Sequence, residues 1–198
     1  SNSNSNSNSN FEFEFEFEFE FEIRIRIRIR VGGQVVVVAG DVGLDDVHVA
    51  LKATEKMPRV VINPDPTRGQ LSSLLVGLET VEQVGADAVV VTLVDVPLVT
   101  VDTVQTLLDT YKSARAPIVR PTRLDDSEHG HPVIFDRELF TKLRQASLSE
   151  GAKPVVRSYE HVAVNVPVDD EGAFADIDTP SDYERLTGRP FPRGTRER

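Results

Sequence analysis

The sequence predicts an α/β fold of three layers, in which helices cover both faces of a mostly parallel sheet. Beyond Gly32 and Gly33, short apolar segments alternate with amphipathic ones, which is typical of strands that alternate with helices. Residues 35–39 are an unbroken apolar run that suits a strand buried on both faces, and residues 88–94, apolar except at Thr92, predict a second strand. The 198 residues fit a single domain with one sizeable core.

Each element follows from a local pattern of apolar and turn residues. We expect residues 88–94 to form the central strand, with parallel neighbours on both sides. Leucines at helical spacing predict a helix around residues 71–78, and a cap with proline and an acid predicts one after Thr179. The other expected strands are residues 35–39, 60–63, 118–120, 132–135 and 162–166, and the other expected helices are residues 44–56, 101–113 with Thr100 as N-cap, and 138–144.

The first 30 residues consist of perfect dipeptide repeats and are treated as a segment separate from the domain at residues 31–198. They repeat Ser-Asn over residues 1–10, Phe-Glu over 11–22 and Ile-Arg over 23–30. Strict alternation predicts extended strands, and pairing a Glu strand with an Arg strand would be charge-complementary. One interpretation is artefactual, tag or added strand material. The other is a module for self-association.

Composition narrows the classes of partner. With 22 basic and 32 acidic residues the net charge is −10, which argues against broad binding to nucleic acid or to an anionic membrane. The chain has no cysteine, which removes disulfides and thiolate chemistry. No apolar run approaches the roughly 18 residues of a membrane span, and no signal-peptide pattern opens the chain. We therefore expect a cytoplasmic location.

Acidic residues that follow strands are the first candidates for chemistry. Ligands of open α/β sheets bind beyond the carboxyl ends of the strands, and Asp95 follows the run at residues 88–94. Asp176 and Asp178 flank Ile177 before the last helix, so both would point away from the core if Ile177 points into it. A pair of such carboxylates suits Mg²⁺. The alternative is that these acids merely cap the next turn or helix.

Two loops are weaker candidates. Residues 63–74 place a loop before a helix whose first turn holds Ser72 and Ser73, where hydroxyl and N–H groups could contact a base or a phosphate. Gly130 and His131 enter another strand, and His131 could donate to an anionic substrate or simply fix the turn. Loops and helix starts favour these residue types in any case.

Four segments, taken together and in order, resemble the MobA-like nucleotidyltransferases, with the molybdenum cofactor cytidylyltransferases as the closest branch. They are residues 63–78, 93–97, 130–135 and 176–180. The resemblance implies a Rossmann-like fold and Mg²⁺-dependent transfer of a nucleotidyl group from CTP, or another nucleoside triphosphate, to a phosphorylated small-molecule acceptor such as molybdopterin. It further implies that Asp95 and Asp178 bind Mg²⁺, that Ser72 and Ser73 border the nucleotide, and that Gly130 and His131 lie on the acceptor side.

The N-terminal repeats depart from that family. Its members begin with a strand and a glycine-rich loop that holds Arg and Lys against the triphosphate, whereas the first lysine here is Lys52 and the repeats contain no glycine. We therefore expect this chain to bind nucleoside triphosphate weakly and to transfer nucleotidyl groups slowly or not at all. The rival hypothesis is a non-catalytic α/β scaffold that carries a self-associating β-repeat segment.

Overall fold

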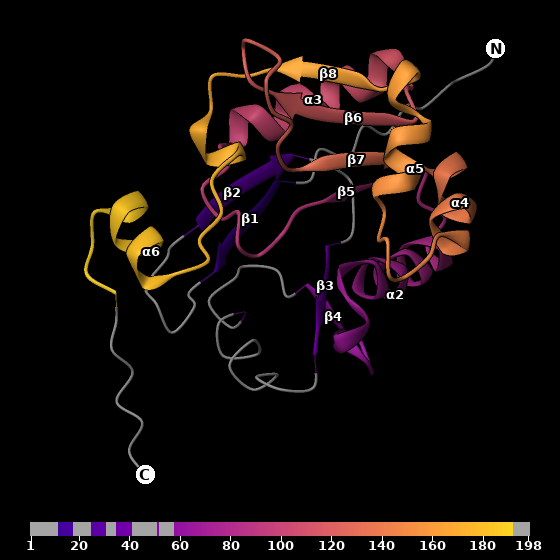
Figure 1. The fold of residues 1–198 in the computed structure, drawn as a ribbon, viewed down its shortest axis with the longest axis horizontal. Coiled ribbons are helices and arrows are strands. Elements are labelled where there is room, and N and C mark those ends of the chain that lie inside the picture. Colours follow the sequence, from indigo (N-terminus) through magenta and orange to yellow (C-terminus); the bar gives the residue numbers. More distant parts are fainter. Residues whose placement is uncertain (1–11, 18–24, 31–34, 41–50, 52–57, 192–198) are drawn as a thin grey trace, which may run out of the picture.

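The computed structural model describes residues 12–17, 25–30, 35–40, 51 and 58–191 (Figure 1). Strands and helices are interspersed along this part of the chain, so the α/β class is confirmed. The strands are β1 (Glu12–Phe17), β2 (Ile25–Arg30), β3 (Val36–Ala39), β4 (Arg59–Ile62), β5 (Ala88–Val91), β6 (Ile118–Thr122), β7 (Val133–Asp136) and β8 (Val164–Pro167). The α-helices are α2 (Gln70–Gln83), α3 (Val101–Ala114), α4 (Phe140–Gln145), α5 (Lys153–Ser158) and α6 (Pro180–Thr187), and the 3-10 helices are η1 (Pro66–Arg68), η2 (Arg137–Leu139), η3 (Glu160–Val162) and η4 (Glu171–Ala173).

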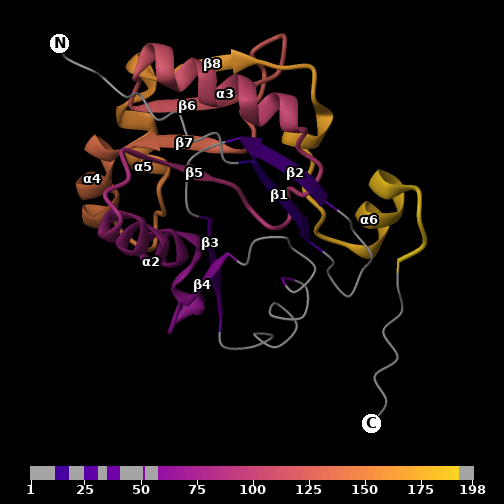
Figure 2. The same cartoon turned by 180° about the vertical axis from the view of Figure 1, so that it is seen from behind.

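The described strands form three sheets. The largest has the order β5-β7-β6-β8, with β7 antiparallel to both of its neighbours and β8 parallel to β6. Strands β3 and β4 form a parallel pair, and β1 and β2 form an antiparallel pair. Of the five described pairings two are parallel and three antiparallel, so the described sheets are mixed and not mostly parallel as expected. Figures 1 and 2 show α3 on one face of the four-stranded sheet and α5 on the opposite face.

The prediction for residues 88–94 was wrong in two respects. Strand β5 stops at Val91, because the chain bends into a turn at Val94 and Asp95, in which the N–H of Val96 donates to the carbonyl of Leu93 (3.3 Å). In addition, among the described strands β5 lies at the end of the sheet order and pairs only with the antiparallel β7. An apolar run predicted a strand but could not specify its neighbours.

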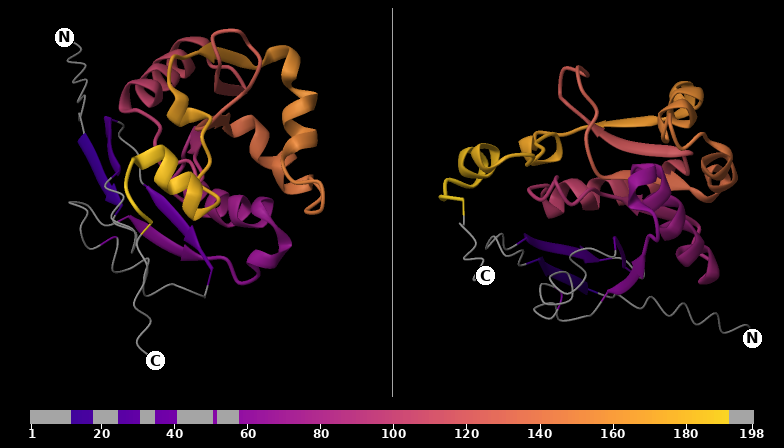
Figure 3. Two further views of the ribbon diagram at one scale, coloured as in Figure 1. Left: turned by 60° about the vertical axis from the view of Figure 1, so that its left-hand side comes forward. Right: turned by 60° about the horizontal axis from the view of Figure 1, so that its bottom comes forward.

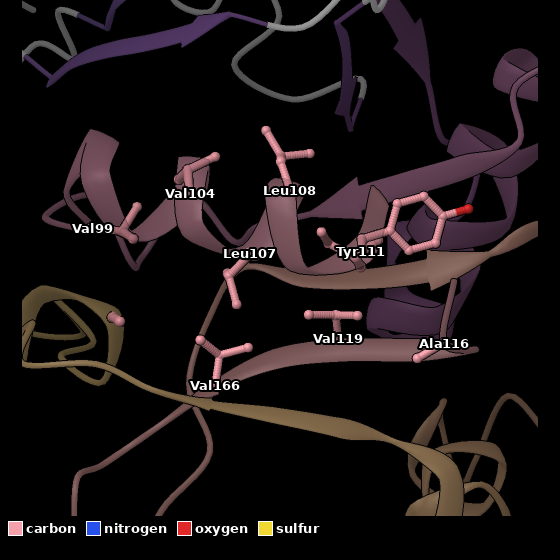
Figure 4. Close-up of a cluster of buried hydrophobic side chains, with 10 residues drawn as sticks. Val99, Val104, Leu107, Leu108, Tyr111, Ala116, Val119 and Val166 are labelled. Carbon is pink, nitrogen blue, oxygen red and sulfur yellow. The ribbon is translucent and has the colours of Figure 1, made fainter. Parts of the chain in front are cut away.

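The first hydrophobic core lies between α3 and the four-stranded sheet (Figure 4). Helix α3 turns one apolar stripe toward the sheet, where its leucines and Tyr111 meet Val119 of β6 and Val166 of β8. Leu107 and Val119 are completely buried. This core fixes the helix whose N-terminus, at Thr100, follows Asp95 by five residues.

The second core, on the other face, joins α2, α4 and α5 to the same sheet. Leu78, Phe140 and Val155 come from these three helices and pack with Ile118 of β6. Val36 of β3 packs at the margin of this core. Helix α2 contacts β3, β4 and β5, so it connects the parallel pair to the larger sheet.

The predicted helix ends are confirmed where the structure describes them. The side chain of Thr100 accepts from the N–H of Thr103 at the start of α3. Thr179 and Asp182 form a capping box at the start of α6, and Gly188 ends that helix with a left-handed backbone. Helix α5 was not predicted. The helix expected at residues 44–56 lies outside the described residues, apart from Leu51, which is helical and completely buried.

The repeats are extended wherever they are described, as the alternation predicts. In the register of β1 and β2, Glu12 lies opposite Arg30 and Phe13 opposite Ile29, and the same pairing of residue types continues along both strands. Strand β2 also contacts α3. Figure 3 shows this hairpin beside the α/β body. Along the described chain, every helix is too short or too polar to cross a membrane.

Candidate active site

The candidate site is built around the turn that follows β5. Asp95 is half-buried there, and its carbonyl accepts a 2.8 Å hydrogen bond from the N–H of Ile177. That bond turns Ile177 inward and leaves Asp176 and Asp178 exposed on either side. The predicted alternation is therefore confirmed, although residues 175–178 are irregular and do not form the strand end that the sequence suggested.

The segment at residues 170–174 connects Asp95 to the rest of the site. Gly172 lies so close to Leu98 that an added Cβ would overlap the leucine carbonyl. Leu98 is only three residues beyond Asp95. A side chain at position 172 would therefore push the two segments apart, and glycine permits their contact.

A second close approach brings in the loop before β7. A Cβ at Gly130 would overlap the carbonyl of Ala173 and lie 2.8 Å from the ring of Phe174. The next residue, His131, donates its N–H to the same carbonyl at 2.8 Å. The segment that ends in Asp178 thus holds both predicted loops, the one with Asp95 and the one with Gly130 and His131.

The charges of these residues influence one another. Burial raises the pKa of Asp176, and the negative charges of Asp95 and Asp178 raise it further, while His131 lowers it. The hydrogen bonds from Ile177 to Asp95 and from His131 to Ala173 hold these groups in one region of the molecule. The structure therefore brings together Asp95, His131 and Asp178 from the predicted set, and adds Asp176.

Two buried polar atoms of this region lack a hydrogen-bond partner. They are Oδ1 of Asp95 and Nδ1 of His131. A buried carboxylate oxygen without a donor is costly unless a cation or another donor reaches it, so Asp95 suits a metal ligand. Among the described residues no three His, Cys, Asp or Glu side chains form a metal-binding group. An ion here would take most of its ligands from water or substrate, as Mg²⁺ does.

The loop between β4 and α2 uses its polar groups internally. Asn63 is buried, and its Nδ2 donates to Oγ of Ser72 (2.8 Å) and to Oγ of Ser73 (3.0 Å). Ser72 is also buried and donates to the carbonyl of Gly69 at 2.7 Å. Ser72 therefore stabilises the loop, and Ser73, which is half-buried, is the more accessible of the two hydroxyls. Contact of either serine with a nucleotide stays a prediction.

Sequence reasoning missed the segment that holds the site together. Asp170, Gly172 and Ala173 act through backbone contacts and buried hydrogen bonds, which no spacing rule specifies. The only signal was a glycine inside an acidic stretch between a strand and a helix. That signal marks a turn but not its partners.

Comparison with known proteins identifies the family of the chain. Residues 25–163 match the family model of the MobA-like NTP transferase domain. That range begins inside the Ile-Arg repeat and ends before Asp176. Over 123 residues the chain is 30% identical to the purine catabolism protein PucB of Bacillus subtilis, a match that covers 62% of this chain and 58% of PucB. The chain thus spans less than two thirds of this relative.

Solved structures show the same fold. The Rv0371c protein of Mycobacterium tuberculosis H37Rv is 28% identical, with a TM-score of 0.65 over 79% of this chain and 76% of its own. Its complex with manganese gives 28% and 0.63 over 79% of this chain and 78% of that one. The 4-diphosphocytidyl-2C-methyl-D-erythritol synthase of Anaerococcus prevotii, 14% identical with a TM-score of 0.61 over 79% of each chain, shows the fold alone. The fold is Rossmann-like, and the chain belongs to the MobA-like NTP transferase domain family.

Proposed function

We propose that residues 58–191 carry the metal and acceptor side of a nucleotidyltransferase site. The observation that carries this proposal is the buried, unpartnered Oδ1 of Asp95, which lies beside the acidic segment joined to it by the bond from Ile177 to Asp95. Asp95 and Asp178 would hold Mg²⁺, which when bound would neutralise negative charge on the triphosphate. Manganese in the Rv0371c complex supports a divalent ion in this family.

The reaction proposed is transfer of a nucleotidyl group from CTP, or another nucleoside triphosphate, to a phosphorylated small-molecule acceptor such as molybdopterin. An acceptor phosphate oxygen forms a bond to the α-phosphorus, and the bond to the pyrophosphate leaving group breaks. No protein nucleophile is required, because positioning and charge neutralisation supply most of the catalysis.

The chain's own residues would position the two substrates. Gly130 lets its loop pack against Ala173, and His131 presents an unpartnered ring nitrogen that could hydrogen-bond an acceptor phosphate. Ser73, and Ser72 through its support of the loop, would border the nucleotide. We also propose a cytoplasmic location, with which the absence of cysteine is compatible.

A titration with Mn²⁺, followed by the paramagnetic relaxation of water protons, tests the metal site without requiring turnover. We expect Asp95→Asn to weaken Mn²⁺ binding about tenfold or more, and Asp178→Asn to weaken it by a similar factor. Asp109→Asn is the matched control, since Asp109 is an exposed acid of α3 paired with Lys112. Equal Mn²⁺ affinity in all four proteins would exclude this site.

A second candidate, a scaffold with a self-associating repeat segment, is favoured by β1 and β2, which form a two-stranded sheet whose outer edges pair with no other described strand. Light scattering during gel filtration of the whole chain and of a chain lacking residues 1–30 separates the two candidates. A larger mass that requires the repeats supports the scaffold. If both chains are monomers, the scaffold is rejected and only the transferase proposal remains.

A further inference from the structure

We propose that Asp170 is a positioning residue that sets the distance between the Asp95 turn and the Asp178 segment. This inference rests on the proposed function for its consequence, metal affinity, but its structural content can be measured separately. Asp170 touches neither candidate metal ligand. It would act through the backbone that carries them.

The carboxylate of Asp170 is buried and fully used. Its side chain belongs to a residue only 9% exposed. Oδ2 accepts from the N–H of Thr100 (2.9 Å), from Oγ1 of Thr100 (2.8 Å) and from Oγ1 of Thr103 (2.6 Å). Oδ1 accepts from the N–H of Gly172 at 3.0 Å. Four donors thus converge on one group, three of them from the start of α3.

These bonds join two segments that otherwise meet at few points. Asp170 anchors its own segment to the N-terminus of α3, whose preceding turn contains Asp95. Two residues later Gly172 packs against Leu98, and Ala173 accepts from His131. Farther along, Ile177 donates to the carbonyl of Asp95. Release of the first anchor would let the whole segment, and Asp178 with it, shift relative to Asp95.

Only an acceptor fits this environment. Both oxygens of Asp170 face N–H or O–H donors, so an asparagine must turn its NH₂ toward at least one donor. At Oδ2 the amide would oppose the N–H of Thr100, while the two threonine hydroxyls could turn to accept from it, and at Oδ1 it would oppose the N–H of Gly172. The substitution Asp170→Asn preserves size and removes this match, which makes it the sharpest probe.

Asp136→Asn is the matched control. Asp136 is also a carboxylate that caps a short helix, accepting from Tyr111 O–H (2.7 Å) and from the N–H of Glu138 (3.0 Å), but it lies at the opposite end of β7 from His131. Any general loss of stability should appear in both variants. A change confined to the site should appear only in Asp170→Asn.

The experiment is amide hydrogen exchange of the full chain by NMR, with Mn²⁺ titration of the same samples. We expect Asp170→Asn to speed exchange of the His131 and Ile177 amides at least tenfold and to weaken Mn²⁺ binding by a comparable factor, while Asp136→Asn changes neither. Unchanged exchange at both amides, or equal acceleration in both variants, would overturn the inference.

A second, milder pair of variants tests the inference if Asp170→Asn does not fold. Thr103→Val removes the 2.6 Å bond to Asp170, and Thr106→Val, which removes an exposed bond to the carbonyl of Asp102, is its control. Faster exchange at His131 and Ile177 only in Thr103→Val supports the inference, and no difference between the pair rejects it. If the wild-type chain binds no Mn²⁺, the metal proposal fails, and the exchange data still decide the role of Asp170.

Discussion

The four-stranded sheet and the β3–β4 pair differ in how deeply their strands are buried. All five residues of β6 are buried in the larger sheet, whereas no residue of β3 is fully buried in the smaller one. The larger sheet has a core on each face, while the β3–β4 pair contacts that body chiefly through α2. Within the described residues, the proposed metal and acceptor side thus has a deeply buried support, and the proposed nucleotide side is joined to it chiefly by α2.

This division falls across the candidate site. Asp95, His131 and Asp178 belong to the larger sheet or to segments packed on it. The loop with Ser73 follows β4 and begins α2. Alignment of a triphosphate with the acceptor would require both parts. We therefore expect the two parts to respond differently to substitution.

The largest expected effect is on the rate of nucleotidyl transfer, because the repeats lack the glycine-rich loop with which the family holds the triphosphate. Replacing residues 1–30 with a family-like first strand and glycine-rich loop should raise nucleotidyl transfer by about two to four powers of ten. Each charge-assisted hydrogen bond to the triphosphate contributes about 1.5–3 kcal/mol, and two such bonds give that range. Calorimetry with MgCTP and a pyrophosphate-release assay on both proteins provide the measurement. Equal binding and turnover would show that the repeats do not limit activity.

The next effect tests packing in the two parts. Phe140→Ala removes a side chain that is 1% exposed from the core under β6, and should lower the free energy of unfolding by about 3–5 kcal/mol. Ile62→Ala removes a side chain of β4 that is 48% exposed, and should cost less than about 1 kcal/mol. Urea denaturation measures both. Similar costs would mean that β4 is as tightly packed as the larger sheet.

Glycine-to-alanine substitutions at positions 130 and 77 test the packing of the larger sheet's side and of the β3–β4 side, respectively. Gly130→Ala should lower the free energy of unfolding by about 1–3 kcal/mol, because its Cβ meets the backbone carbonyl of Ala173, which cannot rotate away. Gly77→Ala lies inside α2, and its Cβ would be 3.3 Å from Cγ2 of Val38 in β3. Since β3 is only partly buried, Val38 can yield, and the gain in helix propensity of up to about 1 kcal/mol should prevail.

Thermal unfolding of the two alanine variants gives the comparison directly. A melting temperature that rises for Gly77→Ala and falls for Gly130→Ala agrees with the difference between the sheets. If Gly77→Ala also destabilises the chain, the contact between α2 and β3 is tighter than the exposure of β3 implies.

The sequence predicted the elements better than their arrangement. Apolar runs and capping residues placed β3, β4, α3 and α6 within about one residue, because these signals are local. The position of β5 at the end of its sheet was missed, since pairing partners come from distant parts of the chain. Helix α5 was missed because Gly151 and Pro154 indicate a turn, although proline is compatible with a first helical turn.

The sequence predicted the site only in outline, because local signals mark candidate residues but not the contacts between distant segments. Asp95 and Asp178 could be chosen because each carboxylate comes shortly before a helix or after a strand, where ligands bind. Their connection through Ile177 depends on one hydrogen bond, and the support from Asp170 on three, between segments 67 to 82 residues apart. Such contacts leave no periodic trace in a sequence. The glycine-rich loop of the family entered the prediction only through its contrast with the repeats, which contain no glycine.

The last expected effect is the pH dependence that Asp170 adds to the stability of the larger sheet. Burial alone would raise the pKa of Asp170, but hydrogen bonds from Thr103, Thr100 and Gly172 outweigh it and hold this pKa below its ordinary value. A folded-state pKa below the unfolded value of about 3.9 means that the ionised form is favoured by folding. Its contribution is therefore complete above about pH 4 and is lost as the pH falls through the folded pKa.

The measurement is the free energy of unfolding of the wild-type chain and of Asp170→Asn, by urea denaturation at several values between pH 7 and pH 2. We expect the difference between the two proteins to be constant near neutral pH and to shrink below about pH 4, by less than the 1.5–3 kcal/mol of one charge-assisted hydrogen bond. Amide exchange should place this loss at the start of α3 and not in α2, since the four donors to Asp170 lie at Thr100, Thr103 and Gly172. A difference that stays constant down to pH 2 would mean that the carboxylate of Asp170 is not preferentially ionised in the folded chain. A loss shared equally by α2 would mean that the two parts unfold as one unit, and the contrast between the sheets would then concern packing and not stability.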